Sequence, residues 1–430
     1  MVRGAGRYWQ DERRAGVLLV VAACAAVALA SSPWATGFDA VWAHRARVPV
    51  LGSTVVDVRG WIDDGAMAIF FLVVGLEIGR ERHAGSLASW RRAFVPVVAA
   101  FGGMAGAAAV YAAVVHGGSG SAGWGVPMAT DIALVAGAAA VLGERLPAGL
   151  RLFLVTLAVA DDVGSVVVLA VVSGSDVHPG WLAVAAGLAA VLLVGRRRWR
   201  SAWPVLVAVV PMWIVLARAG VEPSLAGALA GVLAPVAALV PDGRPVRLSG
   251  PRLERMLHPL SALVVLPLFA LANVGVDLRG SLLGPPGAMA VFIAVVAARV
   301  VGKPVGIVLA AKGGGRSVGV DRPGRVGTDR LVGGAALAGA GFTVPLLFAA
   351  VSFADQPALF EAASAGLLAG SAGASVLGSA LLVVLHRRRP GSERGGGPTA
   401  CDDEPVPGGR SPRAVGQPAP TGPDQAGRFG

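Results

Sequence analysis

The stretch LFLVTLAVADDVGSVVVLAVVSG, residues 152–174, is a long apolar segment with two adjacent carboxylates, Asp161 and Asp162, near its middle. About 20 apolar residues in a helix suffice to cross a bilayer, so this stretch is long enough to span a membrane. On an insertion scale each ionised Asp at mid-membrane costs about 2.5–3.5 kcal/mol, so the pair costs roughly 5–7 kcal/mol. A cost of that size indicates that the pair has a function.

The two aspartates cannot share one narrow face of a helix, because successive helical residues point about 100° apart. One of them can face a water-filled cavity while the other faces a neighbouring helix. Buried acids can exchange protons near neutral pH, and carboxylate oxygens are also ligands for hard cations. We interpret the pair as a cation and proton site inside a membrane; the alternative is a charged helix start at the membrane interface.

The composition is that of a polytopic membrane protein. Of the 430 residues, 55% are hydrophobic and only 15% are charged, and the mean hydropathy is +0.68. The two cysteines, Cys24 in an apolar segment and Cys401 in a polar tail, imply neither a disulfide framework nor a zinc site. The net charge of +11 does not indicate nucleic-acid binding, because the basic residues separate the apolar segments.

The chain contains twelve apolar segments that we predict to be transmembrane helices, which makes the fold an all-α polytopic membrane protein. They lie near 15–31, 63–79, 93–115, 124–143, 149–173, 180–195, 202–218, 223–240, 257–275, 287–311, 331–353 and 358–386. The first resembles a signal peptide, but no clear cleavage site follows it, so we expect it to be retained. Alternate connections hold 26 and 5 basic residues. The positive-inside rule therefore places both termini in the cytoplasm.

Three regions follow from this pattern. Residues 1–14 are expected to form a cytoplasmic N-terminus, residues 15–389 the membrane domain, and residues 390–430 a disordered cytoplasmic tail rich in Gly, Pro and Ser. In the first outer connection, RVPVLGSTVVDVR (residues 47–59) alternates Val with polar residues and predicts a short external β-hairpin.

Two of the predicted helices are expected to be broken. Span four, GWGVPMATDIALVAGAAAVLG (residues 123–143), has Pro127 before Thr130 and Asp131. Span eleven, LVGGAALAGAGFTVPLLFAAV (residues 331–351), is rich in glycine. Each is the second helix of a three-span unit, spans 3–5 and 10–12, and the two units start on opposite sides of the membrane. Broken spans at matching places of inverted-topology repeats point to a transport site at the midplane.

Two further charged residues are predicted inside the membrane. Asp131 and Asp161 each lie 15 residues from Leu146 in the turn between spans four and five, which places both at about 22 Å from that turn. Lys303 lies within ARVVGKPVGIVLA (residues 298–310) in a chain with only one other lysine. A lysine at this depth requires a partner or a function, unless it extends to the cytoplasmic surface. Arg299 is interpreted as an interface or loop-facing charge.

A third group of titratable residues lies at predicted cytoplasmic helix ends. Glu77 ends span two, and Glu254 and His258 open span nine. They form either an acidic, titratable entrance funnel or a set of ordinary interfacial anchors.

The motifs together resemble the NhaA-type sodium/proton antiporters of bacterial inner membranes. They occur in the order WIDDGAMAIFFLVVGLEIGRE, MATDIALVAG, LAVADDVGSVVVLA, RLERMLHPL, LPLFALANVGV, VGKPVGI and GAGFTVPLLFA, from about residue 12 to residue 386. The resemblance implies two broken helices that cross, localisation in the plasma (inner) membrane, and electrogenic export of Na+ or Li+ in exchange for H+. It implies no cofactor, no enzymatic activity and no nucleic-acid partner, and the sequence leaves a homodimer open.

The resemblance also implies roles for individual residues. Asp162 and Asp161 would bind Na+ and protons, with Thr130 close by. Asp131 and Lys303 would neutralise the dipole ends of the two broken helices, with Lys303 at the carbonyl end of span eleven, and Lys303 would also pair with Asp161.

The sequence departs from the family pattern at three positions. Gly79 replaces a common Lys, Arg255 replaces a His of well-known members, and Pro345 replaces a small polar residue. The first two put the family's pH regulation, and so the funnel of Glu77, Glu254 and His258, in doubt. The third could alter the bend of span eleven.

Two other functions remain as alternatives. A cation channel requires rings of identical ligands or a carbonyl filter, which one asymmetric Asp pair does not supply. An intramembrane aspartyl protease requires two facing aspartates, whereas Asp161 and Asp162 point apart on one helix.

Overall fold

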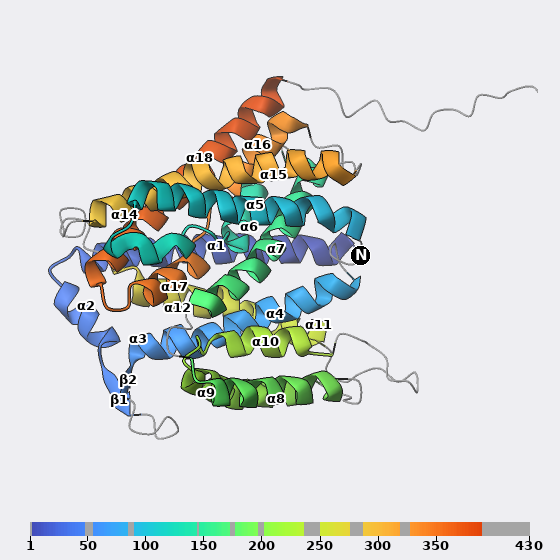
Figure 1. Ribbon diagram of the computed structural model, residues 1–430. Coiled ribbons are helices and arrows are strands. Elements are labelled where there is room, and N and C mark those ends of the chain that lie inside the picture. The colour runs from blue at the N-terminus through green and yellow to red at the C-terminus, as the bar shows by residue number, and fades with distance from the viewer. Residues whose placement is uncertain are drawn as a thin grey trace, which may run out of the picture. The chain divides into compact units, whose positions relative to one another are not determined.

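A computed structural model describes most of the chain up to residue 388 (Figure 1). The described residues are 2–47, 55–84, 90–143, 146–172, 177–196, 202–235, 250–275, 287–318 and 327–388. The expected disordered tail, residues 390–430, lies outside them, within a separate unit that begins at Arg389.

The described part is almost entirely helical. Its α-helices are α1 (Val2–Ala30), α2 (Ala35–Trp42), α3 (Val58–Gly60), α4 (Met67–Ala84), α5 (Trp90–Val115), α6 (Ile132–Leu142), α7 (Ala148–Val172), α8 (Pro179–Gly195), α9 (Trp203–Ala219), α10 (Leu225–Leu233), α11 (Gly250–Leu260), α12 (Leu266–Asn273), α14 (Ala288–Ala297), α15 (Lys303–Val318), α16 (Thr328–Leu337), α17 (Thr343–Ser352) and α18 (Pro357–Arg388). Shorter helical turns are the 3₁₀ turn η4 (Ser119–Gly125) and the π turns η2 (Trp61–Ala66), η6 (Ser261–Val265) and η7 (Ala298–Gly302).

The predicted β-hairpin is present in the connection that follows the first apolar segment. Strand β1 (Arg45–Arg47) pairs antiparallel with β2 (Val55–Asp57), with Arg45 opposite Asp57 and Arg47 opposite Val55. The tip of the hairpin lies outside the described residues. Asp57 then accepts a hydrogen bond from the Gly60 backbone N–H at 2.8 Å and so caps the short helix α3.

The predicted spans overlap helices of the structure, and the all-α membrane fold is confirmed. By length and composition, five helices or continuous helix runs in the described residues qualify as membrane spans, or six when the bent pair α1 and α2 is one span. The other segments are shorter, broken or carry charges, so the count of twelve stays a prediction. Helix α1 begins at Val2, well before the expected start of its apolar segment.

The two predicted breaks are present and face each other. Span four is split into η4 and α6, with residues 126–131 between them, and span eleven is split into α16 and α17, with residues 338–342 between them. The Asp131 backbone N–H donates to the Ala340 carbonyl at 3.1 Å, which joins one unwound segment to the other. The third helices of the two three-span units, α7 and α18, each pack against the first helix of their own unit, α5 and α14 respectively.

Glycines let two pairs of helices approach closely. At Gly227 and Gly231 of α10 the neighbouring atoms are backbone of α4, and at Gly306 of α15 they are backbone of α5 around Gly102. Close backbone approach at small residues is the usual packing mode of membrane helices. The second pair holds α15, and so Lys303, against the middle of α5.

We predict that Gly306→Ala destabilises the protein. Its new methyl group would overlap the Gly102 carbonyl, which is backbone and cannot move aside. Overpacking of this kind costs about 1–3 kcal/mol. Thermal melting in detergent should therefore show a lower Tm for Gly306→Ala. The matched control is Gly187→Ala in α8, where nothing lies within 4 Å of the new methyl group. Equal melting of both variants would contradict the close packing of α5 and α15.

Candidate functional site

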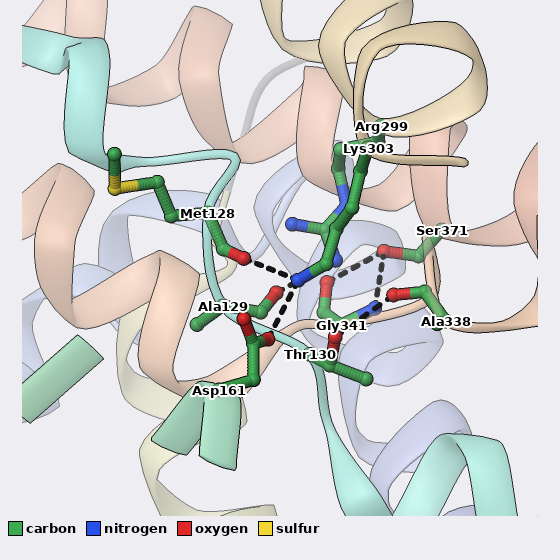
Figure 2. Close-up of polar contacts among 9 residues, drawn as sticks. All are labelled: Met128, Ala129, Thr130, Asp161, Arg299, Lys303, Ala338, Gly341 and Ser371. Carbon is green, nitrogen blue, oxygen red and sulfur yellow. Dashed lines mark hydrogen bonds and ion pairs between the residues drawn. The ribbon is translucent and has the colours of Figure 1, made fainter. Parts of the chain in front are cut away.

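Asp161 is tied to Lys303 inside the helix bundle. The Lys303 Nζ lies 2.6 Å from Asp161 Oδ2, and both side chains have no exposed surface. Figure 2 shows the lysine reaching down to the break of span four, where it also donates to the Met128 carbonyl. The alternative that Lys303 extends to the membrane surface is wrong, because it is fully buried.

Asp162 points away from this pair and lines a small cavity. The cavity has a volume of about 60 Å³ and is also lined by Glu77, Thr130, Asp131 and His258, and a space of this size can hold several water molecules. Only 5% of the Asp162 surface is exposed. The two neighbouring acids thus have the different surroundings predicted from their helical spacing, one at a neighbouring helix and one at a cavity.

Asp131 caps two helices at once. Its Oδ1 accepts from the Leu134 N–H at 3.3 Å, at the start of α6. Its Oδ2 accepts from the Thr343 hydroxyl at 3.0 Å and from the Thr343 N–H at 3.4 Å, at the start of α17. A negative charge stabilises helix N-termini, where N–H groups lack partners. Asp131 therefore holds the N-terminal ends of both half-helices together.

The carbonyl ends of the breaks are satisfied by different groups. The Thr130 hydroxyl donates at 2.9 Å to the Ala338 carbonyl, which follows α16. Lys303 donates to the Met128 carbonyl in span four, whereas we expected its charge to offset the carbonyl end of span eleven. The difference arises because α15 packs along α5, and this packing brings its first residue over the break of span four.

Arg299 is a site residue that sequence reasoning missed. We interpreted it as an interface or loop-facing charge, but it is fully buried in η7, one turn before Lys303. Its Nη2 donates to the Ala129 carbonyl at 3.4 Å. The sequence signal was the spacing of four residues from Lys303, which puts both side chains on one side of the helix.

The predicted entrance residues are brought together in part. Glu77 and His258 line the same cavity as Asp162. Glu254 is linked to them through Arg80, whose Nε lies 3.3 Å from Glu254 Oε2 and whose Nη2 lies 3.5 Å from Glu77 Oε1. Sequence reasoning missed Arg80 as the group that joins these acids.

The described residues include no group of three or more His, Cys, Asp or Glu side chains arranged to hold a metal ion as a resident cofactor. The arrangement combines Asp162, which lines the cavity, with Asp131, which caps two helices at the same cavity, and Asp161, which is paired with Lys303. An acid of this kind can release a proton and accept a small cation in its place.

Comparison with known sequences gives the same assignment as the motifs. A family described as Na+/H+ antiporter 1 matches residues 6–382. The chain belongs to this family. It is 40% identical to the Na(+)/H(+) antiporter NhaA 3 of Frankia alni, over 92% of this chain and 90% of that protein. It is 42% identical to the Na(+)/H(+) antiporter NhaA of an Acidovorax species over 87% and 90%, and 38% identical to that of Pseudomonas entomophila over 86% and 93%.

The structure shows how two of the three residues that depart from the family pattern are accommodated. Pro345 lies in the first turn of α17, where its missing N–H leaves no helical bond unmade, so a bend of span eleven at this residue is not required. Arg255 is exposed, and its Nε donates to the Pro251 carbonyl of its own helix. Gly79 lies within α4, and nothing in the structure explains its replacement of a lysine.

We predict that replacing Lys303 separates stability from transport. Lys303→Ala leaves Asp161 buried without its partner, which costs on the order of 3–5 kcal/mol. Lys303→Arg keeps the charge, but the planar guanidinium does not fit in the place of the compact ammonium group. Arginine also does not release its proton. Melting in detergent should rank the parent first, then Arg, then Ala, and both variants should lose sodium/proton exchange or change its pH dependence. The control is Lys312→Ala, at the other lysine of the chain, which should behave as the parent. Parent-like melting and exchange by Lys303→Ala would show that the ion pair has no role.

Proposed function

We propose that this protein is a secondary antiporter that exports Na+ or Li+ across the bacterial inner membrane in exchange for protons. The observation that supports this proposal most strongly is the separation of the two adjacent acids. Asp162 lines a cavity, whereas Asp161 is paired with Lys303. The names of the relatives and the membership in the Na+/H+ antiporter 1 family support the same exchange. The lipid bilayer is its surroundings, and an electrogenic stoichiometry and a homodimer follow from the resemblance only.

In this proposal Asp162 is the residue that exchanges one ion for the other. A protonated Asp162 offers no charge to sodium, and a deprotonated Asp162 beside Thr130 offers oxygen ligands to it. Asp161 is the second acid of the site. Its Oδ2 is engaged by Lys303, whereas its Oδ1 accepts no hydrogen bond from any described residue. That free oxygen supports a role for Asp161 as a second ligand or proton carrier, once the ion arrives.

The broken helices supply the alternating access that an antiporter requires. Both unwound segments border the site, and hydrogen bonds between backbone and short side chains join them. A rearrangement of one three-span unit against the other can therefore open the site to either face. The entrance formed by Glu77, Glu254, His258 and Arg80 lies on the side that the positive-inside rule assigns to the cytoplasm. A role for it in pH sensing is a proposal that rests on this position.

We predict that Asp162→Asn abolishes exchange while the protein still inserts in the membrane. Asparagine keeps the shape of the side chain but has no proton to exchange and no charge for sodium. The measurement is sodium-induced dequenching of a ΔpH dye in inverted vesicles, with potassium as the ion control. Asp355→Asn, at an exposed acid after α17, is the matched variant and should leave exchange intact. Normal dequenching in Asp162→Asn would remove the site assignment.

A companion variant, Asp161→Asn, is expected to weaken exchange or to change its coupling. It loses either a proton carrier or the partner of Lys303. If its activity and pH profile equal those of the parent, Asp161 has no part in the exchange.

We also predict that sodium and protons compete for one site. A cation binds only deprotonated carboxylates, so the apparent sodium affinity should fall as the pH drops. Currents on solid-supported membranes, measured from about pH 6 to about pH 9, give this affinity at each pH. A sodium affinity that stays flat over that range would contradict competition, and a leak of sodium without proton movement would favour a channel.

A further inference from the structure

Arg299 is the largest fully buried side chain among the described residues, and no step of the proposed exchange uses it. It lies in η7, where the helix from α14 to α15 widens by a π turn just before Lys303. Figure 2 shows Arg299 and Lys303 side by side above the unwound segments, each with its charged end towards them. An arginine that is buried this deeply in a membrane protein indicates a function.

Glycines make the space for this guanidinium. A Cβ at Gly341 would overlap Arg299 Nη2, and a Cβ at Gly370 of α18 would lie 3.2 Å from Arg299 Cδ. At Gly339 the nearest atom is the Arg299 carbonyl oxygen, at 2.5 Å from the position of a Cβ. The unwound segment of span eleven and the helix that covers it are therefore shaped around Arg299, and a larger residue at these positions would displace it.

The hydrogen bonds of Arg299 do not account for its burial. A guanidinium has five N–H groups, but the bond from Nη2 to the Ala129 carbonyl is long, at 3.4 Å. Its Nε and Nη1 find no acceptor among the described residues. A buried charge with so few bonds must be stabilised by opposite charges nearby. The acids close enough to attract it are Asp161 and Asp131.

The sum of the charges near the two unwound segments indicates what Arg299 does. Three acids, Asp131, Asp161 and Asp162, face two cations, Lys303 and Arg299. When all five groups are charged, the net charge of the centre is negative by one unit. Either one bound sodium ion or one proton on Asp162 makes the centre neutral. Without Arg299 the same sodium-loaded centre would carry a negative charge inside the membrane, and one more acid would have to hold a proton.

We infer that Arg299 is a fixed countercharge of the transport site, which offsets the negative charge of the acids around the two unwound segments. Arginine suits this task because its guanidinium group stays charged when it is buried. Arg299 does not touch the exchanged ion in this arrangement. It is a positioning residue that sets the pH range in which the site accepts sodium, and the inference rests on the proposed sodium/proton exchange.

Other titratable groups near η7 do not replace it. Helix α14 has no charged residue between Ala288 and Ala297. Tyr111 of α5 donates its hydroxyl to the Gly120 carbonyl at 2.7 Å. On α18 the acid Glu361 lies nine residues before Gly370, which is about 13 Å along the helix.

The test compares Arg299→Gln and Arg299→Lys with the parent, by sodium affinity as a function of pH in proteoliposomes. Loss of the charge lets the remaining acids hold protons more tightly, so Arg299→Gln should bind sodium weakly at neutral pH. Its affinity profile should move to higher pH by about one unit, as expected when a unit charge within roughly 10 Å is removed. At high pH and saturating sodium its rate should approach that of the parent. Arg299→Lys keeps the charge and should restore the parent profile.

Arg151→Gln is the matched control. Arg151 also donates a guanidinium N–H to a backbone carbonyl, that of Gly143 at 3.2 Å, but near the start of α7. Its loss should leave the pH profile in place.

An Arg299→Gln profile that coincides with the parent profile, even at lower overall activity, would overturn the inference and leave Arg299 a packing residue. If Arg299→Gln does not insert, Arg299→Lys decides, and a profile shifted from the parent in that variant overturns the inference. The exchange by the parent is measured in the same experiment, so a failure of the proposed function appears as a parent without exchange, and the inference then falls with it.

Discussion

Backbone that leaves a helix inside a membrane must find its hydrogen-bond partners within the protein, because lipid offers none. This constraint acts on residues 126–131 and 338–342, where two helices are broken at the same place. Each segment satisfies the other through the Asp131 N–H and the Thr130 hydroxyl, which donate to carbonyls of the opposite segment. The charged side chains are placed according to their sign. The acid Asp131 lies at the N-terminal ends of the half-helices, and the bases Lys303 and Arg299 lie at backbone carbonyls.

The two adjacent aspartates can differ in role because they project into different surroundings. A helix turns about 100° per residue, so the same segment offers one carboxylate to Lys303 and the next to the cavity. Asp161 is held by a partner whose removal would leave a buried charge. Asp162 lines the cavity instead, and it can change its ligand without breaking an ion pair. Such a division gives one site both a fixed and an exchangeable acid.

Much of this arrangement could be predicted from local sequence. Gly and Pro in spans four and eleven marked both breaks, the position of Asp161 and Asp162 within one helix fixed their divergence, and alternation near Val55 marked the hairpin. Contacts between distant segments could not be predicted in the same way. That Lys303 meets the Met128 carbonyl depends on how closely α15 packs against α5, which is a property of the tertiary structure.

Arg299 and Arg80 were missed for a related reason. Arg80 stands at the end of a predicted span, where a surface charge is the usual interpretation, and Arg299 was interpreted in the same way although it lies within the predicted span 287–311. Only the packing of η7 against the unwound segments shows that Arg299 is fully buried, and only the pairing of α4 with α11 brings Arg80 to Glu254.

The central claim is that sodium displaces a proton from Asp162, and proton release from the purified protein tests it directly. Sodium chloride is added to the protein in detergent and weak buffer with a pH-indicator dye, and potassium chloride serves as the control. The account predicts that the parent releases protons on addition of sodium, that potassium releases none, and that Asp162→Asn loses the sodium response. Sodium binding without proton release, or equal release by Asp162→Asn, would contradict it.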